Sequence, residues 1–90
     1  MRKLPRDFKL HWGKGVIAEE ASAQTPFHEP CIQLLQFEDG SRSLRFCTYN
    51  HEGRFQRVPL IVSEEAIDAL RESVQANPGI RELIEKLAAP

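Results

Sequence analysis

The sequence lacks a long apolar run and contains little cysteine. Its longest apolar stretch, Val58-Pro59-Leu60-Ile61-Val62, is far too short to cross a bilayer. The opening residues MRKLPRDFKL are charged and hold no apolar centre of the kind that a secretory signal requires. Two cysteines favour free thiols over a disulfide framework. We therefore expect a cytoplasmic protein that has no membrane partner.

Motifs of the common enzyme classes are also missing. The sequence has no phosphate-loop motif, no serine-nucleophile elbow, no zinc-protease helix motif and no Cys-x-x-Cys pair. The short segment Trp12-Gly13-Lys14-Gly15 is expected to be flexible backbone. Glu64, Glu65 and Asp68 are typical of a solvated helix surface and not of a catalytic carboxylate pair. We therefore expect a protein that is not an enzyme and needs no cofactor.

The charge is nearly balanced overall but unevenly distributed. The net charge of -1 gives no general attraction to nucleic acid. Residues 1–15 nevertheless carry five bases and one acid, whereas residues 63–90 carry six acids and three bases. This asymmetry would suit contacts between copies or a modest anion-binding patch. A chain of 90 residues also has a small core, which dimerisation would enlarge.

Residues 1–90 are expected to form one domain in three parts. Residues 1–29 are interpreted as a basic arm with a short edge strand at 16–21. Residues 31–62 are expected to form an antiparallel sheet, because two turns place glycine third, where a three-residue hairpin needs positive φ. These turns are Glu38-Asp39-Gly40 and His51-Glu52-Gly53. Residues 63–87 are expected to be helical.

The two turns predict one alignment of the strands. The first pairs Ile32 with Phe46 and Leu34 with Leu44, and the second pairs Phe46 with Val58 and Leu44 with Leu60. Both turns place the same side chains on one face, which we predict to be buried. Its members are Ile32, Leu34, Leu44, Phe46, Val58 and Leu60.

Helix signals follow the sheet. Ser63 is a suitable N-cap, and Pro78 should end one helix near Asn77 and start another. Each helix carries an apolar stripe, which predicts packing against the sheet. The stripes consist of Ala66, Ile67, Leu70 and Val74, and of Ile80, Leu83, Ile84 and Leu87.

Cysteine and histidine residues meet at one end of the predicted hairpin. Cys31 and Cys47 are directly opposite, and His28 and His51 lie at the same end. Four such donors could hold tetrahedral zinc. The plainer interpretation is two half-buried thiols and two surface imidazoles.

The opposite face of the sheet is predicted to carry aromatic residues and arginines. Tyr49 is expected to pair with Phe55, and Cys47 with Arg57, with Arg45 alongside. Gln33 and Phe37 lie nearby. Such a face offers stacking platforms and phosphate contacts to single-stranded nucleic acid. Alternatively, residues 1–29 cover this face and the aromatic residues are packed beneath them.

The stretch from Phe37 to Val74 resembles the single-stranded-DNA-binding transcriptional coactivators of the positive cofactor four family and, more loosely, the Whirly proteins. Gly40 is followed at the family's spacing by Leu44, Phe46 and Tyr49, and Val62 is followed by Glu65, Ile67, Leu70 and Val74. The resemblance implies a β4-α unit that dimerises through its helix and binds unpaired DNA on its sheets. This chain departs from the family at Cys47-Thr48, in its short second loop, and at Phe37.

These observations predict an α+β fold, with an antiparallel meander of about four strands followed by a C-terminal helix, in a helix-mediated homodimer. The predicted function is a non-enzymatic binder of single-stranded nucleic acid in transcription regulation. The alternative is a protein–protein interaction module that binds no nucleic acid. The candidate nucleic-acid-binding residues are Arg45, Tyr49, Phe55, Arg57, Phe37, Arg54, Lys14 and Lys9.

Overall fold

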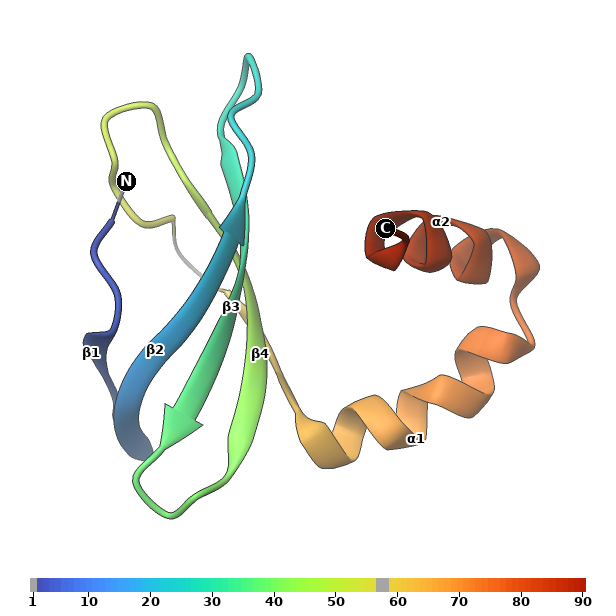
Figure 1. Cartoon of the computed structure of the whole chain (residues 1–90), viewed down its shortest axis with the longest axis horizontal. Helices are drawn as coiled ribbons and strands as arrows, with labels where there is room; N and C mark the ends of the chain where they lie inside the picture. The colour runs from blue at the N-terminus through green and yellow to red at the C-terminus, as the bar shows by residue number, and fades with distance from the viewer. Residues whose placement is uncertain (1, 57–58) are drawn as a thin grey trace.

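One antiparallel sheet is followed by two helices, as Figure 1 shows. The computed structural model describes residues 2–56 and 59–90. Neighbouring strands are consecutive in the chain, so the sheet order is β1-β2-β3-β4-β5. The α+β class and the meander are confirmed, with five strands in place of about four. The elements are β1 (Arg6–Leu10), β2 (Gly13–Ser22), β3 (Glu29–Phe37), β4 (Arg42–Tyr49), β5 (Leu60–Ser63), α1 (Glu64–Gln75) and α2 (Pro78–Ala88).

The first 29 residues contain two strands, not one edge strand. β2 pairs with β1 on one side and β3 on the other, so it lies inside the sheet. The β2–β3 register shifts between Ile17 and Glu19. Such a bulge breaks the two-residue alternation that marks a strand in sequence. This irregularity explains why the sequence pattern underestimated β2.

The β3–β4 hairpin has the predicted alignment. Ile32 lies opposite Phe46, Leu34 opposite Leu44, and Cys31 opposite Cys47. Gly40 has a φ of 90°, which is the conformation that its place in the turn requires. The predicted turn chemistry therefore sets this register correctly.

The predicted β4–β5 alignment is wrong by two residues. Tyr49 does bridge to Phe55, but Phe46 lies opposite Leu60 and Leu44 opposite Val62. Tyr49 and Phe46 are three residues apart on β4, whereas their partners Phe55 and Leu60 are five residues apart, so the second segment has two more residues than β4 can pair with. Pro59 lies within this interruption and cannot donate a ladder hydrogen bond. Arg57 and Val58, for which pairing was also predicted, lie outside the described residues.

The buried face of the sheet is the reverse of the predicted one. We call the face toward the helices the outer face; it carries Ile32, Leu34, Leu44, Phe46 and Leu60, and there Phe46 is 37% and Leu60 62% exposed. The opposite, inner face is buried. It carries Cys31, Gln33, Leu35, Ser43, Arg45, Cys47 and Tyr49.

The inner face is buried because the sheet curls over it. Two strands, β2 and β3, separate β1 from β4 in the sheet order, yet Arg6 of β1 donates a hydrogen bond to the hydroxyl of Tyr49 on β4. At the other end, Phe8, Ile17 and Leu35 form an apolar cluster with Ile61 of β5 packed against it. The alternative in which residues 1–29 cover this face is therefore the observed one.

The helices begin and end where the sequence predicts. The Ser63 hydroxyl accepts a hydrogen bond of 3.1 Å from the amide of Ala66, and Pro78 occupies the first turn of α2. α1 ends at Gln75, just before the predicted stop at Asn77. Among the described residues, no helix is long and apolar enough to span a membrane.

The predicted packing of the helical stripes against the sheet is only partial for α1 and is absent for α2 among the described residues. α1 contacts β4, β5 and α2, whereas among the described elements α2 contacts only α1. We call residues 64–88 the helical arm; it extends beside the outer face, as Figure 1 shows. Its large apolar side chains are exposed: Ile67, Leu70, Ile80, Leu83, Ile84 and Leu87.

The close approach of β2 and β3 at Gly15 predicts a destabilising effect of any side chain there. A Cβ at Gly15 would overlap the backbone carbonyl of Gln36. We expect Gly15→Ala to lower the free energy of unfolding by about 1–3 kcal/mol, measured by urea denaturation. Gly79→Ala is the matched control, because Gly79 lies in α2 with open space around it. Alanine there should raise stability by up to about 1 kcal/mol, and equal effects at the two positions would contradict the close approach.

Candidate functional site

Polar side chains occupy the inner face where a small domain usually buries apolar ones. Gln33 has no exposed surface, and Arg45 and Tyr49 are 7% and 6% exposed. A buried polar group costs stability unless it finds a hydrogen-bonding partner. The partners of these side chains therefore determine what this face can do.

Gln33 joins three strands through its side-chain amide. Its Oε1 accepts a hydrogen bond of 2.7 Å from Nε of Arg45 on β4. Its Nε2 donates to Oε2 of Glu20 on β2 at 2.6 Å and to the hydroxyl of Tyr49 at 3.0 Å. The amide thus holds an arginine, a carboxylate and a phenol in fixed positions.

Two further arginines complete the cluster from the N-terminal side. Arg2 donates to both carboxylate oxygens of Glu29, at 3.2 and 2.6 Å, and its Nε donates to Glu20 at 3.2 Å. Arg6 donates to Glu20 at 3.0 Å and to the Tyr49 hydroxyl at 3.2 Å. We call Arg2, Arg6, Glu20, Glu29, Gln33, Arg45 and Tyr49 the inner polar cluster.

Both carboxylates of the cluster are held in the ionised form. Burial alone would raise the pKa of Glu20, but hydrogen bonds from Arg6 and Gln33 and the charges of Arg6 and Arg2 lower it overall. The hydrogen bond from Arg2 lowers the pKa of Glu29. The same bond raises the pKa of Arg2. Ionised groups that stabilise one another in this way are suited to structure or recognition.

The two thiols are poor nucleophiles. Cys31 and Cys47 are free and are 4% and 8% exposed. Burial raises the pKa of Cys31 to about 11, and burial also raises the pKa of Cys47. Since the thiolate is the reactive form, neither side chain is set up for covalent catalysis near neutral pH.

The predicted exposed surface of aromatic residues and arginines is not assembled. Arg45 and Tyr49 belong to the buried cluster, and the Phe55 ring packs against both of them. The Phe55 ring lies 5.4 Å from the Tyr49 ring and 4.8 Å from the Arg45 guanidinium carbon, and this residue is 40% exposed. The prediction of an exposed Arg45 and Tyr49 was wrong, because the curl of the sheet decides which face meets water.

The remaining candidate residues are scattered. Phe37 packs against Phe8 and Trp12, with ring centroids 5.0 and 5.4 Å apart. Lys9 and Lys14 lie opposite each other at the exposed β1–β2 hairpin. Arg54 is exposed in the β4–β5 loop, and Arg57 lies outside the described residues.

The structure does not assemble the alternative zinc site. Across residues 2–56 and 59–90, no three potential ligand side chains lie together. Cys31 accepts a hydrogen bond of 3.4 Å from Arg2 on the inner face, whereas His51 is bound to the carbonyl of Thr25, 2.9 Å away. Cys31 and His51 thus have separate partners.

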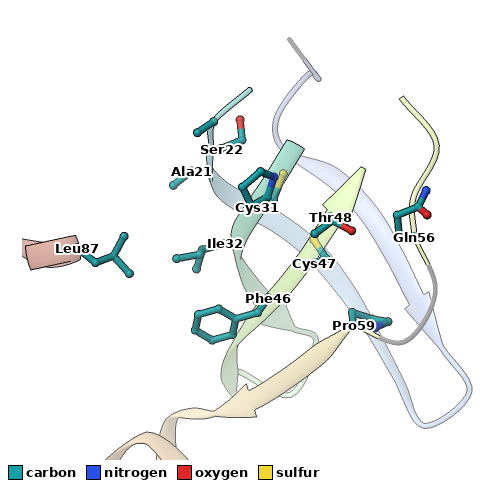
Figure 2. Close-up of a pocket in the computed structure, with 12 residues that line it drawn as sticks. Ala21, Ser22, Cys31, Ile32, Phe46, Cys47, Thr48, Gln56, Pro59 and Leu87 are labelled. Atoms are coloured by element: carbon teal, nitrogen blue, oxygen red, sulfur yellow. The ribbon is translucent and has the colours of Figure 1, made fainter. Parts of the chain in front are cut away.

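A second candidate site lies on the outer face. A groove of about 590 Å³ runs between the sheet and the end of α2. Figure 2 shows Leu87 of α2 pointing toward Ala21, Ile32 and Phe46 of the sheet. The lining is mainly apolar, so the groove is suited to an apolar partner and not to a charged ligand.

No protein-family model, curated protein or solved structure matches this chain. The resemblance to the positive cofactor four family therefore stays a prediction.

Sequence reasoning missed four members of the inner polar cluster: Arg2, Arg6, Glu20 and Glu29. Arg2 and Glu29 are 27 residues apart, so no local spacing connects them. Glu20 lies beyond the bulge in β2, which removes the alternation that would have placed it on the inner face. The only available signal was the excess of bases in residues 1–15.

The ion pairs of Glu20 predict a measurable contribution to stability. Glu20→Gln keeps the shape of the side chain but removes the negative charge between Arg2 and Arg6. Their side chains are 25% and 26% exposed. We therefore expect a loss of roughly 2 kcal/mol in the free energy of unfolding at pH 7, less than for a fully buried pair. Urea denaturation measures this loss.

The loss should shrink in acid. Because folding lowers the pKa of Glu20, this carboxylate stabilises the fold fully above its unfolded pKa of about 4.3. That contribution declines as the pH falls through the lower folded pKa. The difference in the free energy of unfolding between wild type and Glu20→Gln should then become smaller. Glu64→Gln, at an exposed pair with Arg42, is the control and should change stability much less. A gap that is constant from neutral to acidic pH would contradict the ionic role.

Proposed function

We propose that this chain is a non-enzymatic protein-interaction module that forms a homodimer through its outer face and helical arm. The observation that carries the proposal is the large apolar surface that a single copy leaves in water. The outer face and the arm contribute to that surface together, and the groove lies between them.

One copy is too open for a chain of its mass. Its accessible surface is 7194 Å², whereas a compact monomer of 10.3 kDa exposes about 5,400 Å². Its radius of gyration is 14.2 Å, against about 12 Å for a compact domain of this length. The excess surface of about 1,800 Å² is what a partner could cover.

The helical arm needs packing to stay ordered. Isolated helices shorter than about 12–15 residues are marginal in water. α1 and α2 have 12 and 11 residues, and neither contains a buried residue. Leu83 and Leu87 of α2 are 66% and 65% exposed. A partner that covers this stripe supplies the tertiary contacts that one copy lacks.

A second copy fits this surface. The chain carries both halves of an apolar contact, an arm and an outer face, so a two-fold axis can match each arm to the other copy. Covering the whole excess on both copies would bury roughly 3,600 Å², within the range of about 2,000–5,000 Å² for obligate dimers. The net charge of -1 makes repulsion between copies small.

Single-stranded nucleic-acid binding stays a prediction, and the site geometry favours it less. Arg45 and Tyr49, which were expected to contact bases and phosphates, are engaged within the inner polar cluster. Among the described candidates, the exposed ones are Arg54 and Phe55 in the β4–β5 loop, and Lys9 and Lys14 at the β1–β2 hairpin. Affinity for nucleic acid depends mainly on clustered positive charge.

Sedimentation velocity on the nuclease-treated chain tests the proposal. We expect a single species of twice 10.3 kDa at micromolar concentrations. Labelled single-stranded DNA, added at low salt, should not change that species. A monomer at these concentrations contradicts the homodimer, and a salt-sensitive complex with DNA would support the earlier hypothesis instead.

A substitution in the stripe of α2 should dissociate the dimer. Leu83→Glu places a charge among the apolar side chains, and we expect at least a tenfold increase in the dissociation constant. Glu82→Lys is the matched control, because Glu82 lies on the opposite side of the same helix and its charge changes by more. Equal sedimentation of the two variants would contradict the proposed interface.

A further inference from the structure

The guanidinium group of Arg2 is enclosed by groups that recognise guanidinium specifically. The two carboxylate oxygens of Glu29 accept one hydrogen bond each from its two terminal nitrogens, and Glu20 accepts from its Nε. The guanidinium carbon lies 3.7 Å from the centroid of the Tyr49 ring, and the Sγ of Cys31 accepts a further bond. A planar fork between carboxylates and against an aromatic face is a pattern that arginine satisfies and lysine does not.

The walls of this site are held in place without Arg2. Glu29 and Tyr49 are directly paired residues of β3 and β4. Gln33 and Arg6 each donate to both Glu20 and the Tyr49 hydroxyl. The edge-on Phe55 ring supports Tyr49 from the other end. The site is therefore preorganised by the sheet.

The side chain that fills the site comes from outside the sheet. Residues 2–5 belong to no strand, and the Arg2 side chain is 25% exposed. A recess of about 490 Å³ opens beside it, lined by Arg2, Glu20, Ser22, Ala23, Gln24 and Glu29. Another side chain can thus approach the carboxylates from solvent.

We infer that Glu20, Glu29 and Tyr49 form a binding site for an arginine side chain of another polypeptide, which Arg2 occupies in cis. The short connection to β1 keeps Arg2 at a high local concentration, on the order of millimolar or above, so an external arginine competes only weakly while Arg2 is present. The site lies on the inner side of the sheet, away from the outer face. This inference therefore does not depend on the proposed homodimer.

Chemical rescue of Arg2→Ala tests the inference. Tyr49 is the only tyrosine in the chain, so its ring resonances in NMR spectra report the site without ambiguity. We expect Arg2→Ala to shift these resonances, and added N-acetyl-arginine amide to return them toward their wild-type positions. N-acetyl-lysine amide carries the same charge without the planar fork, and it should bind at least tenfold more weakly. The wild type should respond far less, because Arg2 fills the site.

Two further variants keep the test decisive. The double variant Arg2→Ala/Glu29→Gln also removes the carboxylate that accepts two hydrogen bonds from the guanidinium group. Its Tyr49 resonances should no longer respond to the arginine compound. If Arg2→Ala does not fold, Arg2→Lys keeps the positive charge and can be titrated in the same way. Equal responses to the arginine and lysine compounds, or an unchanged response in the double variant, overturn the inference.

Discussion

The interior of this protein depends on the side-chain amide of Gln33. This group has no contact with water, and it joins Arg45, Glu20 and Tyr49 through three hydrogen bonds. Removing any one partner would leave a buried polar group unsatisfied, which costs more than the bond itself contributes. The cluster is therefore cooperative, and it sets how β2, β3 and β4 lie against one another.

Because polar side chains fill much of the inner face, the apolar core of this domain is small. The apolar cluster of Phe8, Ile17 and Leu35 occupies one end of the inner face, while the other end holds arginines and carboxylates. Many of the remaining large apolar side chains lie on the outer face and the helical arm. The same distribution thus accounts both for the charged cluster on the inner face and for the exposed apolar side chains of the helical arm, on which the proposed homodimer rests.

Local sequence signals predicted those features that depend on a few neighbouring residues, such as a turn or the end of a helix. The glycine of the first turn determines the alignment of Ile32 with Phe46, and Ser63 and Pro78 mark the helix boundaries. The second alignment failed because two extra residues enter between Phe55 and Leu60, which no turn residue signals. The shift is even, so the assignment of side chains to two opposite faces survived it.

The sequence by itself determined the alternation of β3 and β4, the turn at Gly40, the helix boundaries at Ser63 and Pro78 and the two apolar stripes. Only the tertiary structure decided that Tyr49 and Arg45 face inward, because alternation separates two faces without saying which one the rest of the chain covers. The contact between Arg2 and Glu29 is likewise decided by the tertiary structure. Their contact depends on how far the sheet curls, which is a property of all five strands together and of no single segment.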